Sequence, residues 1–198
     1  MSETASPGKI LIVGMGLAGM SLAFRLHQRG IPFAIIDPLE DQTSSKVAAG
    51  MWNPIAFKRL NKVWKADTLL PELRSFYAEL ETELGVKLLY DRDIFRIFPN
   101  YEAAQEFHAK AEAEGFSQYM QKENVGYMSQ FGAGLVKQGG YLDLHKALEA
   151  FTGWTLDRNC LIQGVFDESQ AELRENAWVY RGEKYQWIIT CTGYMMYK

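Results

Sequence analysis

The sequence predicts an α/β fold, because three of its segments have the pattern of strands and helices that alternate around a parallel sheet. An apolar run at residues 10–13, after Lys9, stops at a glycine and leads into an apolar helix pattern. A second apolar run ends in an acid at Asp37, and a third, at 185–190, ends in Cys-Thr-Gly near the end of the chain. The first two runs and the helix between them form a βαβ unit, so the predicted fold is Rossmann-like, with a parallel sheet.

The turn of this unit has the spacing GxGxxG, at Gly14, Gly16 and Gly19. The first glycine lets the strand turn sharply into the helix, the second removes a side chain where a pyrophosphate would approach the backbone, and the third lets the helix lie close to the strands. A helix that begins near Gly16 directs its free N–H groups at the phosphates. The unit is therefore predicted to bind a dinucleotide; the plain alternative is a tight turn without a ligand.

The acid at the end of the second strand sharpens this prediction. Asp37 lies about twenty residues after the glycines, where a carboxylate accepts hydrogen bonds from the ribose hydroxyls of the adenosine half. A 2'-phosphate would meet a like charge there, which argues against NADP. The motif alone does not separate NAD from FAD.

Composition narrows the class of partner. The chain has 198 residues, a formal net charge of −3 and 47% hydrophobic residues, which suits a globular protein with no general attraction to nucleic acid or to anionic membranes. Small molecules are the expected partners. Cys160 and Cys191 lie far apart, and no stretch resembles a signal peptide or membrane span, so the predicted location is cytoplasmic. We expect no metal site, and the three histidines lie on three different predicted helices, so no catalytic residue is assigned.

The middle of the chain predicts a region of mixed α and β structure. Apolar residues at helical spacing predict a helix at 66–84, the runs 86–90 and 94–98 predict a hairpin, and a further helix is predicted at 101–114. Glycines and aromatic residues between 126 and 140 favour loops and short strands. We therefore predict an inserted α+β cap at residues 51–133.

The last third of the chain is predicted to return to the first domain. A helix is expected from Asp143, followed by short strands at 154–156 and 161–166 and a small antiparallel meander at 171–181. The final apolar run then supplies a buried parallel strand. The predicted cofactor domain is accordingly discontinuous and comprises residues 1–50 and 134–198.

A resemblance becomes specific at residues 43–54. Here a run of hydroxyl residues leads into Val-Ala-Ala-Gly-Met-Trp-Asn-Pro, which resembles the segment after the second strand in the D-amino acid oxidase family. The resemblance implies FAD as cofactor, with Ser44 and Ser45 on the pyrophosphate. Lys46 departs from the pattern, because some members carry an acid there. The alternative for the two serines is that they cap a short helix at 47–51.

The same family also has a Cys-Thr-Gly element close to the cofactor, which matches residues 191–193. Its members continue well beyond this element into residues that grip the substrate, so the resemblance covers about the first half of a full enzyme. The cofactor-binding residues predicted from the motif and from the resemblance together are Gly14, Gly16, Leu17, Ala18, Gly19, Asp37, Pro38, Ser44, Ser45, Ala49, Gly50, Met51, Leu161, Thr192 and Gly193.

The resemblance implies an FAD-dependent oxidoreductase that oxidises an amine or amino acid by passing a hydride to flavin N5. Two alternatives stay open. An NAD-dependent dehydrogenase could use the same βαβ unit, although it would have no reason to carry the 44–54 segment. A non-catalytic FAD-binding module is the other, because the usual substrate-binding half is missing from these residues. Oligomeric state is not predicted.

Overall fold

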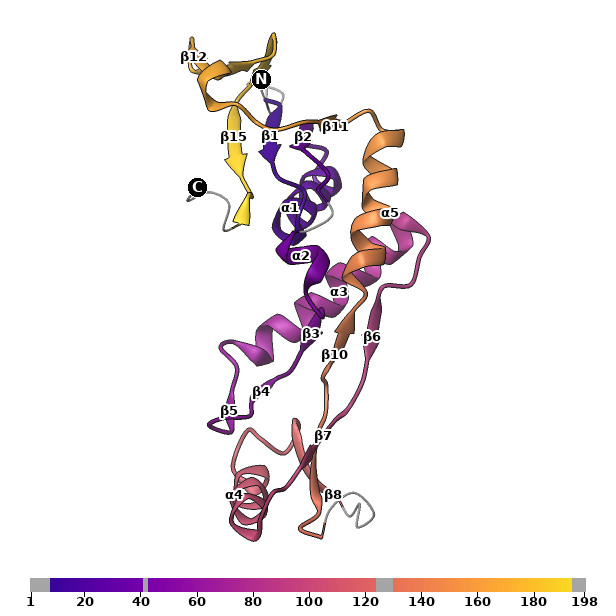
Figure 1. Ribbon diagram of the computed structural model, residues 1–198, viewed down its shortest axis with the longest axis vertical. Coiled ribbons are helices and arrows are strands. Elements are labelled where there is room, and N and C mark those ends of the chain that lie inside the picture. Colours follow the sequence, from indigo (N-terminus) through magenta and orange to yellow (C-terminus); the bar gives the residue numbers. More distant parts are fainter. Residues whose placement is uncertain (1–7, 41–42, 124–129, 194–198) are drawn as a thin grey trace, which may run out of the picture. The chain divides into compact units, whose positions relative to one another are not determined.

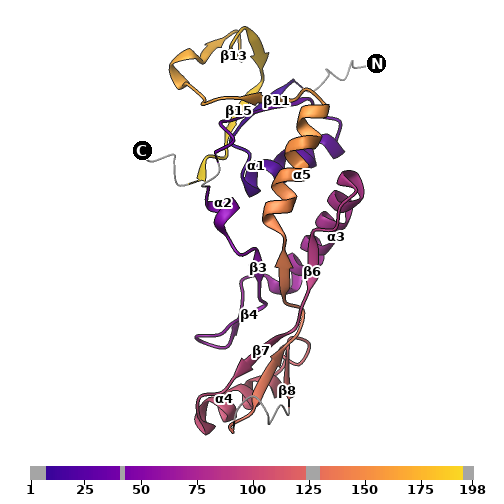
Figure 2. The ribbon, with the colours of Figure 1, turned by 45° about the vertical axis from the view of Figure 1, so that its right-hand side comes forward.

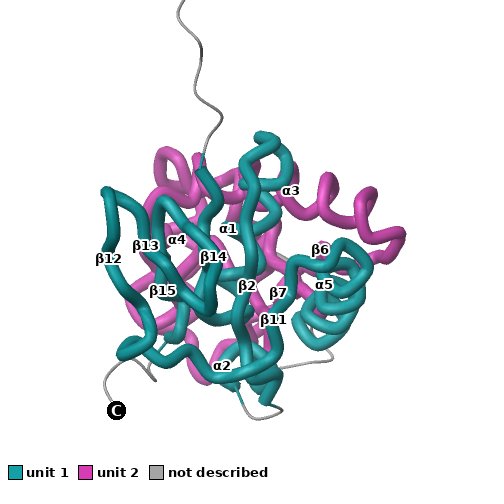
Figure 3. Tube along the Cα trace, turned by 90° about the horizontal axis from the view of Figure 1, so that it is seen from above, with its two compact units in different colours: residues 1–48, 144–198 teal, residues 49–143 magenta. Residues whose placement is uncertain are grey.

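The computed structural model describes residues 8–40, 43–123 and 130–193 (Figure 1). The chain forms two compact units, unit 1 with residues 1–48 and 144–198, and unit 2 with residues 49–143 (Figure 3). The predicted domain boundaries, 1–50 with 134–198 and 51–133, remain a prediction about domains.

A four-stranded parallel sheet forms the centre of unit 1. Its order is β11-β2-β1-β15, in which β1 spans Ile10–Val13, β2 Phe33–Asp37, β11 Leu161–Gln163 and β15 Trp187–Thr190. All four residues of β1 are buried, as expected for a central strand covered on both faces. The predicted parallel sheet, and with it the α/β Rossmann-like fold, is confirmed.

One helix follows the glycine turn and another returns the chain to the sheet. α1 spans Leu17–Gln28 and buries Met20, Ala23 and Phe24, while α5 spans Leu144–Asp157. The two helices pack side by side (Figure 2). The ring of His27 lies edge-on to Trp154, with 4.9 Å between the ring centroids.

The predicted strand at 154–156 is wrong. These residues form the last turn of α5, because Trp154 and Thr155 follow Phe151 at helical spacing and all three are buried. The tertiary packing of this face outweighs the preference of Trp and Thr for strands.

An antiparallel meander covers one face of the sheet of unit 1. It consists of β12 (Glu172–Arg174), β13 (Ala177–Tyr180) and β14 (Glu183–Tyr185), preceded by a short 3-10 helix at Glu168–Gln170. Tyr180 and Tyr185 are almost fully buried and pack in one cluster with the strand residues Leu11, Val13, Ala34 and Ile36. The predicted meander is confirmed.

Unit 2 has two three-stranded antiparallel sheets and a two-stranded ribbon. The first sheet has the order β3-β10-β6, the second β7-β9-β8, and the ribbon pairs β4 with β5. Their bounds are Met51–Trp52 (β3), Ile55–Ala56 (β4), Asn61–Lys62 (β5), Leu89–Asp91 (β6), Ile94–Ile97 (β7), Met120–Glu123 (β8), Ala133–Val136 (β9) and Gly140–Leu142 (β10).

The helices of unit 2 begin and end close to their predicted limits. α3 spans Ala66–Leu84 and ends at Gly85 in a left-handed conformation, which is a common helix terminator. α4 spans Tyr101–Glu112, and the side chain of Asn100 caps it by accepting a hydrogen bond from the N–H of Ala103 at 2.8 Å. The core of the unit gathers Ile55, Leu60, Phe98, Phe107 and Val136, all 2% exposed or less. In the part of the chain that the structure describes, no helix has both the length and the apolar character needed to cross a bilayer.

The predicted hairpin at 86–98 is wrong, although both of its strands exist. β6 pairs with β10 and β7 pairs with β9, so the two neighbours in sequence lie in different sheets. The segment between them does not turn back, because the N–H of Arg92 donates to the carbonyl of Gly139 at 2.9 Å and keeps the chain alongside its partner.

We predict that Gly153→Ala stabilises the protein. Gly153 is exposed inside α5, and a Cβ added there would meet no atom within 4 Å. Alanine should therefore raise the free energy of unfolding by about 0.5–1 kcal/mol, measured by urea denaturation. The matched control is Gly85→Ala, which also has free space but a φ of +68°, so it should cost about 1–2 kcal/mol. A destabilising Gly153→Ala would contradict the helical assignment.

A second prediction concerns acid stability. The Asp67 carboxylate accepts hydrogen bonds from Lys62 Nζ at 2.7 Å, Tyr119 Oη at 2.7 Å and Gln118 Nε2 at 2.9 Å. The bonds from Lys62 and Tyr119 hold the pKa of Asp67 below its ordinary value of 3.8. The stabilisation is thus fully present above that value and is lost as the pH falls through the lower, folded-state pKa.

Asp67→Asn should lower the unfolding midpoint at neutral pH, and the gap to the wild type should narrow only below about pH 4. Thermal unfolding followed at a series of pH values checks this. A gap that is constant down to pH 2 would show that the charge of Asp67 contributes nothing.

Candidate functional site

The glycine turn lies at the carboxyl end of β1, where main-chain atoms of Cys191 and of the turn itself lie close to its glycines. Gly14 has a φ of +99°, and a Cβ there would lie 2.7 Å from the carbonyl oxygen of Cys191. A Cβ on Gly19 would lie only 1.9 Å from the carbonyl oxygen of Gly14. The fold itself therefore requires glycine at both positions.

Gly16 differs from the other two glycines. It is the N-cap of α1 with a φ of −70°, which any residue can adopt. A Cβ there would lie 3.0 Å from Ser45 Oγ, the end of a small side chain. The backbone conformation at 16 thus permits a side chain, provided that Ser45 Oγ, which accepts from Leu17 N–H, shifts by a few tenths of an ångström.

The amino end of α1 has the features of a helix end that favours an anion. No side chain caps it through Gly16, its first turn holds no acid, and Leu17 and Ala18 are exposed. The N–H of Leu17 donates to Ser45 Oγ at 3.0 Å. N–H groups and the positive end of the helix dipole together favour a negatively charged group at this place.

Asp37 lies beside the same turn. Its Oδ2 accepts a hydrogen bond from the N–H of Met15 at 2.6 Å, and its Oδ1 accepts one from the N–H of Leu39 at 2.7 Å. The side chain is half-buried, and the following Pro38 is exposed. A carboxylate has about four acceptor positions, so two remain for hydroxyl groups of a ligand.

The hydroxyl-rich segment forms a short helix, α2, at Ser44–Val47. Its N-cap is Thr43, whose hydroxyl accepts from the N–H of Lys46 at 3.4 Å, while Lys46 Nζ donates to the carbonyl of Glu40 at 2.7 Å. The alternative, in which the serines cap a helix at 47–51, is therefore wrong: a helix is present, but it ends at Val47 and is capped by Thr43. Ser44 is exposed and Ser45 reaches the amino end of α1.

Sequence reasoning did not single out Thr43. Its signal was present, since threonine is a favoured N-cap residue, but the adjacent serines carry the same signal. By starting α2 at Ser44, the cap of Thr43 sets the position from which Ser45 contacts Leu17.

The end of β15 adds a polar atom to the turn. The N–H of Cys191 donates to the carbonyl of Val13 at 2.6 Å, which brings residues 191–193 next to Gly14. Thr192 Oγ1 is buried and has no hydrogen-bond partner among the described residues, and Gly193 is exposed with a φ of +62°. Burial raises the pKa of the Cys191 thiol, so this neighbour is a neutral, weakly reactive group at pH 7.

Leu161 lies nearer the amino ends of the strands than Asp37 does. It pairs with Ile35, whereas Gln163 pairs with Asp37, and the N–H of Gly164 donates to the carbonyl of Asp37 at 3.0 Å. Gln163, the last residue of β11, and Gly164, which follows the strand, are the residues beside the acid. The sequence pattern of a single strand does not show how that strand aligns with its neighbour. The sequence therefore did not point to Gln163 or Gly164.

Ala49, Gly50 and Met51 belong to unit 2. Ala49 and Met51 are exposed, and Gly50 has a φ of +66°. The carbonyl of Gly50 accepts from the N–H of Leu142 at 3.0 Å, and Met51 pairs with Tyr141 on β10. The structure thus places these three residues at the edge of the β3-β10-β6 sheet.

The residues of unit 1 fit the diphosphate and ribose of a dinucleotide. The turn has no side chain at 14, 16 and 19, the helix end offers N–H groups, and Asp37 retains free acceptor positions. Thr192 Oγ1 is a buried hydroxyl that lacks a partner beside this turn. Such a set suits an anionic ligand that also carries hydroxyl groups.

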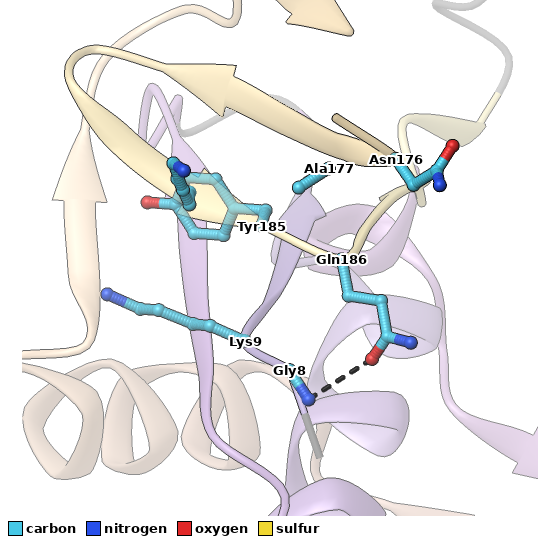
Figure 4. Close-up of a pocket in the computed structure, with 7 residues that line it drawn as sticks. Gly8, Lys9, Asn176, Ala177, Tyr185 and Gln186 are labelled. Atoms are coloured by element: carbon cyan, nitrogen blue, oxygen red, sulfur yellow. Dashed lines mark hydrogen bonds between the residues drawn. The ribbon is translucent and has the colours of Figure 1, made fainter. Parts of the chain in front are cut away.

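A pocket of about 300 Å³ lies elsewhere on unit 1, between the start of β1 and the meander (Figure 4). The N–H of Gly8 donates to Gln186 Oε1 at 3.1 Å, and burial beside Glu183 raises the pKa of Tyr185 to about 12. Gly8 and Gln186 precede β1 and β15, so this pocket is at the amino ends of the strands. Ligands of open parallel sheets bind at the carboxyl ends.

Metal or thiol chemistry has no support in the described residues. Across 8–40, 43–123 and 130–193, no three His, Cys, Asp or Glu side chains come together as a metal site. Cys160 and Cys191 are both free thiols, and burial raises the pKa of each.

Three solved structures illustrate what the chain is similar to. Glycine oxidase from Bacillus cereus ATCC 14579 matches with a TM-score of 0.65 at 19% identity, over 94% of this chain and 55% of that one. L-proline dehydrogenase from P. horikoshii gives 0.64 at 13% (94% and 53%), and iminodiacetate oxidase from Chelativorans sp. BNC1 gives 0.59 at 15% (92% and 55%). These likenesses support the fold, and the chain spans about half the length of the proteins it matches.

The model of the FAD-dependent oxidoreductase family matches residues 9–196, nearly the whole chain. FAD is the cofactor of that family, which confirms the expected cofactor. The chain belongs to the FAD-dependent oxidoreductases of the D-amino acid oxidase type.

Proposed function

We propose that this protein takes part in the FAD-dependent oxidation of an amine or amino acid. The observation that carries the proposal is the glycine turn with Asp37 beside it, in a chain whose family uses FAD. Glycine oxidase, L-proline dehydrogenase and iminodiacetate oxidase, which share its fold, are all named for amino-acid or amine substrates. The common chemistry of those names is a carbon that carries an amine.

In this proposal, residues of unit 1 hold the adenosine diphosphate part of the cofactor. The amino end of α1 at Leu17 and Ala18, together with Ser44 and Ser45, faces the phosphates, and Asp37 accepts from the ribose. Pro38, Leu161, Thr192 and Gly193 complete the proposed cofactor contacts.

The ring end of the cofactor is assigned to Ala49, Gly50 and Met51. When bound, FAD supplies the hydride acceptor, at flavin N5. The chain's own task is then to fix the cofactor and keep its ring accessible, because no described residue is assigned to substrate. Small molecules are the proposed partners, and a cytoplasmic location stays a prediction from cysteine usage.

Two other functions compete with this one. An NAD-dependent dehydrogenase would use the same turn, but family membership favours FAD. A non-catalytic FAD-binding module is kept because the chain spans about half the length of the similar enzymes. Flavin that binds but is not reduced by any member of a panel of amines and amino acids would favour the module.

The first prediction here concerns the choice of cofactor. Titration of the 198-residue protein with FAD should quench its tryptophan fluorescence saturably, and NADH at equal concentrations should have a much weaker effect. The expected reason is that Asp37 and the segment 44–51 together recognise the flavin nucleotide. Saturable binding of NADH alone would support the dehydrogenase instead.

The second prediction separates cofactor binding from folding. Gly16→Ala should leave the unfolding midpoint nearly unchanged, because φ is −70° and only Ser45 Oγ must yield. It should weaken FAD binding by about tenfold or more, because its methyl group occupies the surface that the pyrophosphate approaches. Isothermal titration with FAD and thermal unfolding measure the two effects.

The control for this variant is Gly19→Ala, in which the methyl group would collide with the carbonyl oxygen of Gly14. We expect this change to lower stability as well as binding. Unaltered FAD affinity in Gly16→Ala would show that the cofactor does not pass over the turn.

A further inference from the structure

A hollow of about 430 Å³ opens on unit 2, where the chain passes from one of its three-stranded sheets to the other. The segment between β6 and β7 runs beside the segment between β9 and β10, because the N–H of Arg92 donates to the carbonyl of Gly139 at 2.9 Å. Residues 91–93 and 137–139 line the hollow, together with Arg74 from α3. We call this place the inter-sheet hollow.

Two charged side chains of the inter-sheet hollow neutralise each other. Arg74 donates to Asp91 Oδ1 from Nε at 3.2 Å and from Nη2 at 2.9 Å. Its Nη2 also lies 3.4 Å from the carbonyl oxygen of Gln138. This ion pair therefore joins α3 to β6 and to the 137–139 segment, and it adds no net charge to the lining.

The other three charged side chains are not neutralised in this way. Lys137 Nζ and the carboxylate of Asp93 have no hydrogen-bond or ion-pair partner among the residues that the structure describes. The guanidinium of Arg92 donates from Nη1 to the carbonyl of Asp91 at 2.9 Å, a neutral acceptor that leaves its charge in place. The hollow thus presents two positive charges and one negative charge that no described neighbour balances.

One wall of the hollow is held in an uncommon backbone conformation. Gln138 has a φ of +63°, in the left-handed region that is unfavourable for a residue with a side chain. Two donors fix its carbonyl, Trp52 Nε1 at 2.9 Å and Arg74 Nη2 at 3.4 Å. Strained backbone that the surrounding structure maintains is concentrated at functional sites such as ligand clamps. The shape of this wall therefore does not depend on a ligand.

We propose that the inter-sheet hollow binds a small zwitterion with two negatively charged groups and one ammonium group, as in the acidic amino acids. Charge complementarity carries the assignment: Arg92 and Lys137 each take an anionic group, and Asp93 takes the ammonium. A single exposed ion pair contributes little, so recognition needs all three. The volume of the hollow is within the range of small-molecule sites.

This site is separate from the cofactor residues. The inter-sheet hollow is lined by residues of unit 2 alone, and it includes none of the residues that are proposed to bind FAD. The inference therefore goes beyond the proposed function, and binding to the hollow can be measured without the cofactor.

The test compares three ligands that differ by one group, using the 198-residue protein without FAD. L-glutamate carries all three groups, glutarate lacks the ammonium, and 4-aminobutyrate lacks one carboxylate. Isothermal titration at low salt should show the tightest binding for glutamate, with the other two weaker by about threefold or more. Raising the ionic strength should weaken the binding of glutamate, because the charges that hold it are open to solvent.

Two variants assign the groups of the ligand to side chains. Asp93→Asn should lower the affinity for glutamate to that for glutarate, because the partner of the ammonium loses its charge. Lys137→Gln should weaken both glutamate and glutarate by about three- to tenfold. Neither side chain has a partner to lose, so both variants should keep the unfolding temperature of the wild type.

Lys58→Gln is the matched control, because Lys58 is exposed in the same unit but lies outside the hollow. It should leave all three affinities unchanged.

Three results would overturn the inference. Equal affinities for glutamate, glutarate and inorganic phosphate would show a plain anion site. Unchanged glutamate affinity in both Asp93→Asn and Lys137→Gln would place the binding elsewhere. No binding of glutamate up to about 10 mM would show that the hollow does not take this class of ligand. The titration of the wild type with FAD tests the proposed function separately, since it does not depend on these residues.

Discussion

The structure of unit 1 depends on one close approach, that of α1 to the end of β1. Gly19 lies so near the carbonyl of Gly14 that no side chain fits between them, and this contact fixes where α1 begins. From there its free N–H groups face the carboxyl ends of β1 and β15. Because α1 begins so close to the end of β1, the turn between them contacts Ser45, Asp37 and residues 191–193.

The features that could be predicted from the sequence are those encoded within a few residues. The βαβ unit is one, because the glycine spacing, the helix periodicity and the acid after the second strand all lie in a span of 30 residues. The limits of α3 are another, since its apolar spacing and terminal Gly85 are local signals. The strand propensity of single residues gave a wrong prediction where tertiary packing decides the secondary structure. In the last turn of α5, Trp154 and Thr155 suggested a strand but are helical.

The features that could not be predicted depend on pairing between distant segments. β6 and β7 resemble a hairpin in sequence, yet each pairs with a strand some 40 to 50 residues away. The proximity of Gln163 to Asp37 and the alignment of Met51 with Tyr141 and Tyr90 are set by strand register. A single sequence contains no direct signal of register when both faces of the strand are acceptable.

The double use of Asp37 restricts how this family member could change its nucleotide. Its two carboxylate oxygens anchor the main chain of Met15 and Leu39, so the acid belongs to the framework of the turn as much as to its recognition surface. Exchanging it for a basic or apolar residue to admit a phosphorylated ribose would leave these two backbone donors without acceptors, at a cost of about 1–3 kcal/mol for each one kept from water. A substitution at this position that favours another nucleotide is thus opposed by a loss of folding stability, whatever it does to ligand affinity.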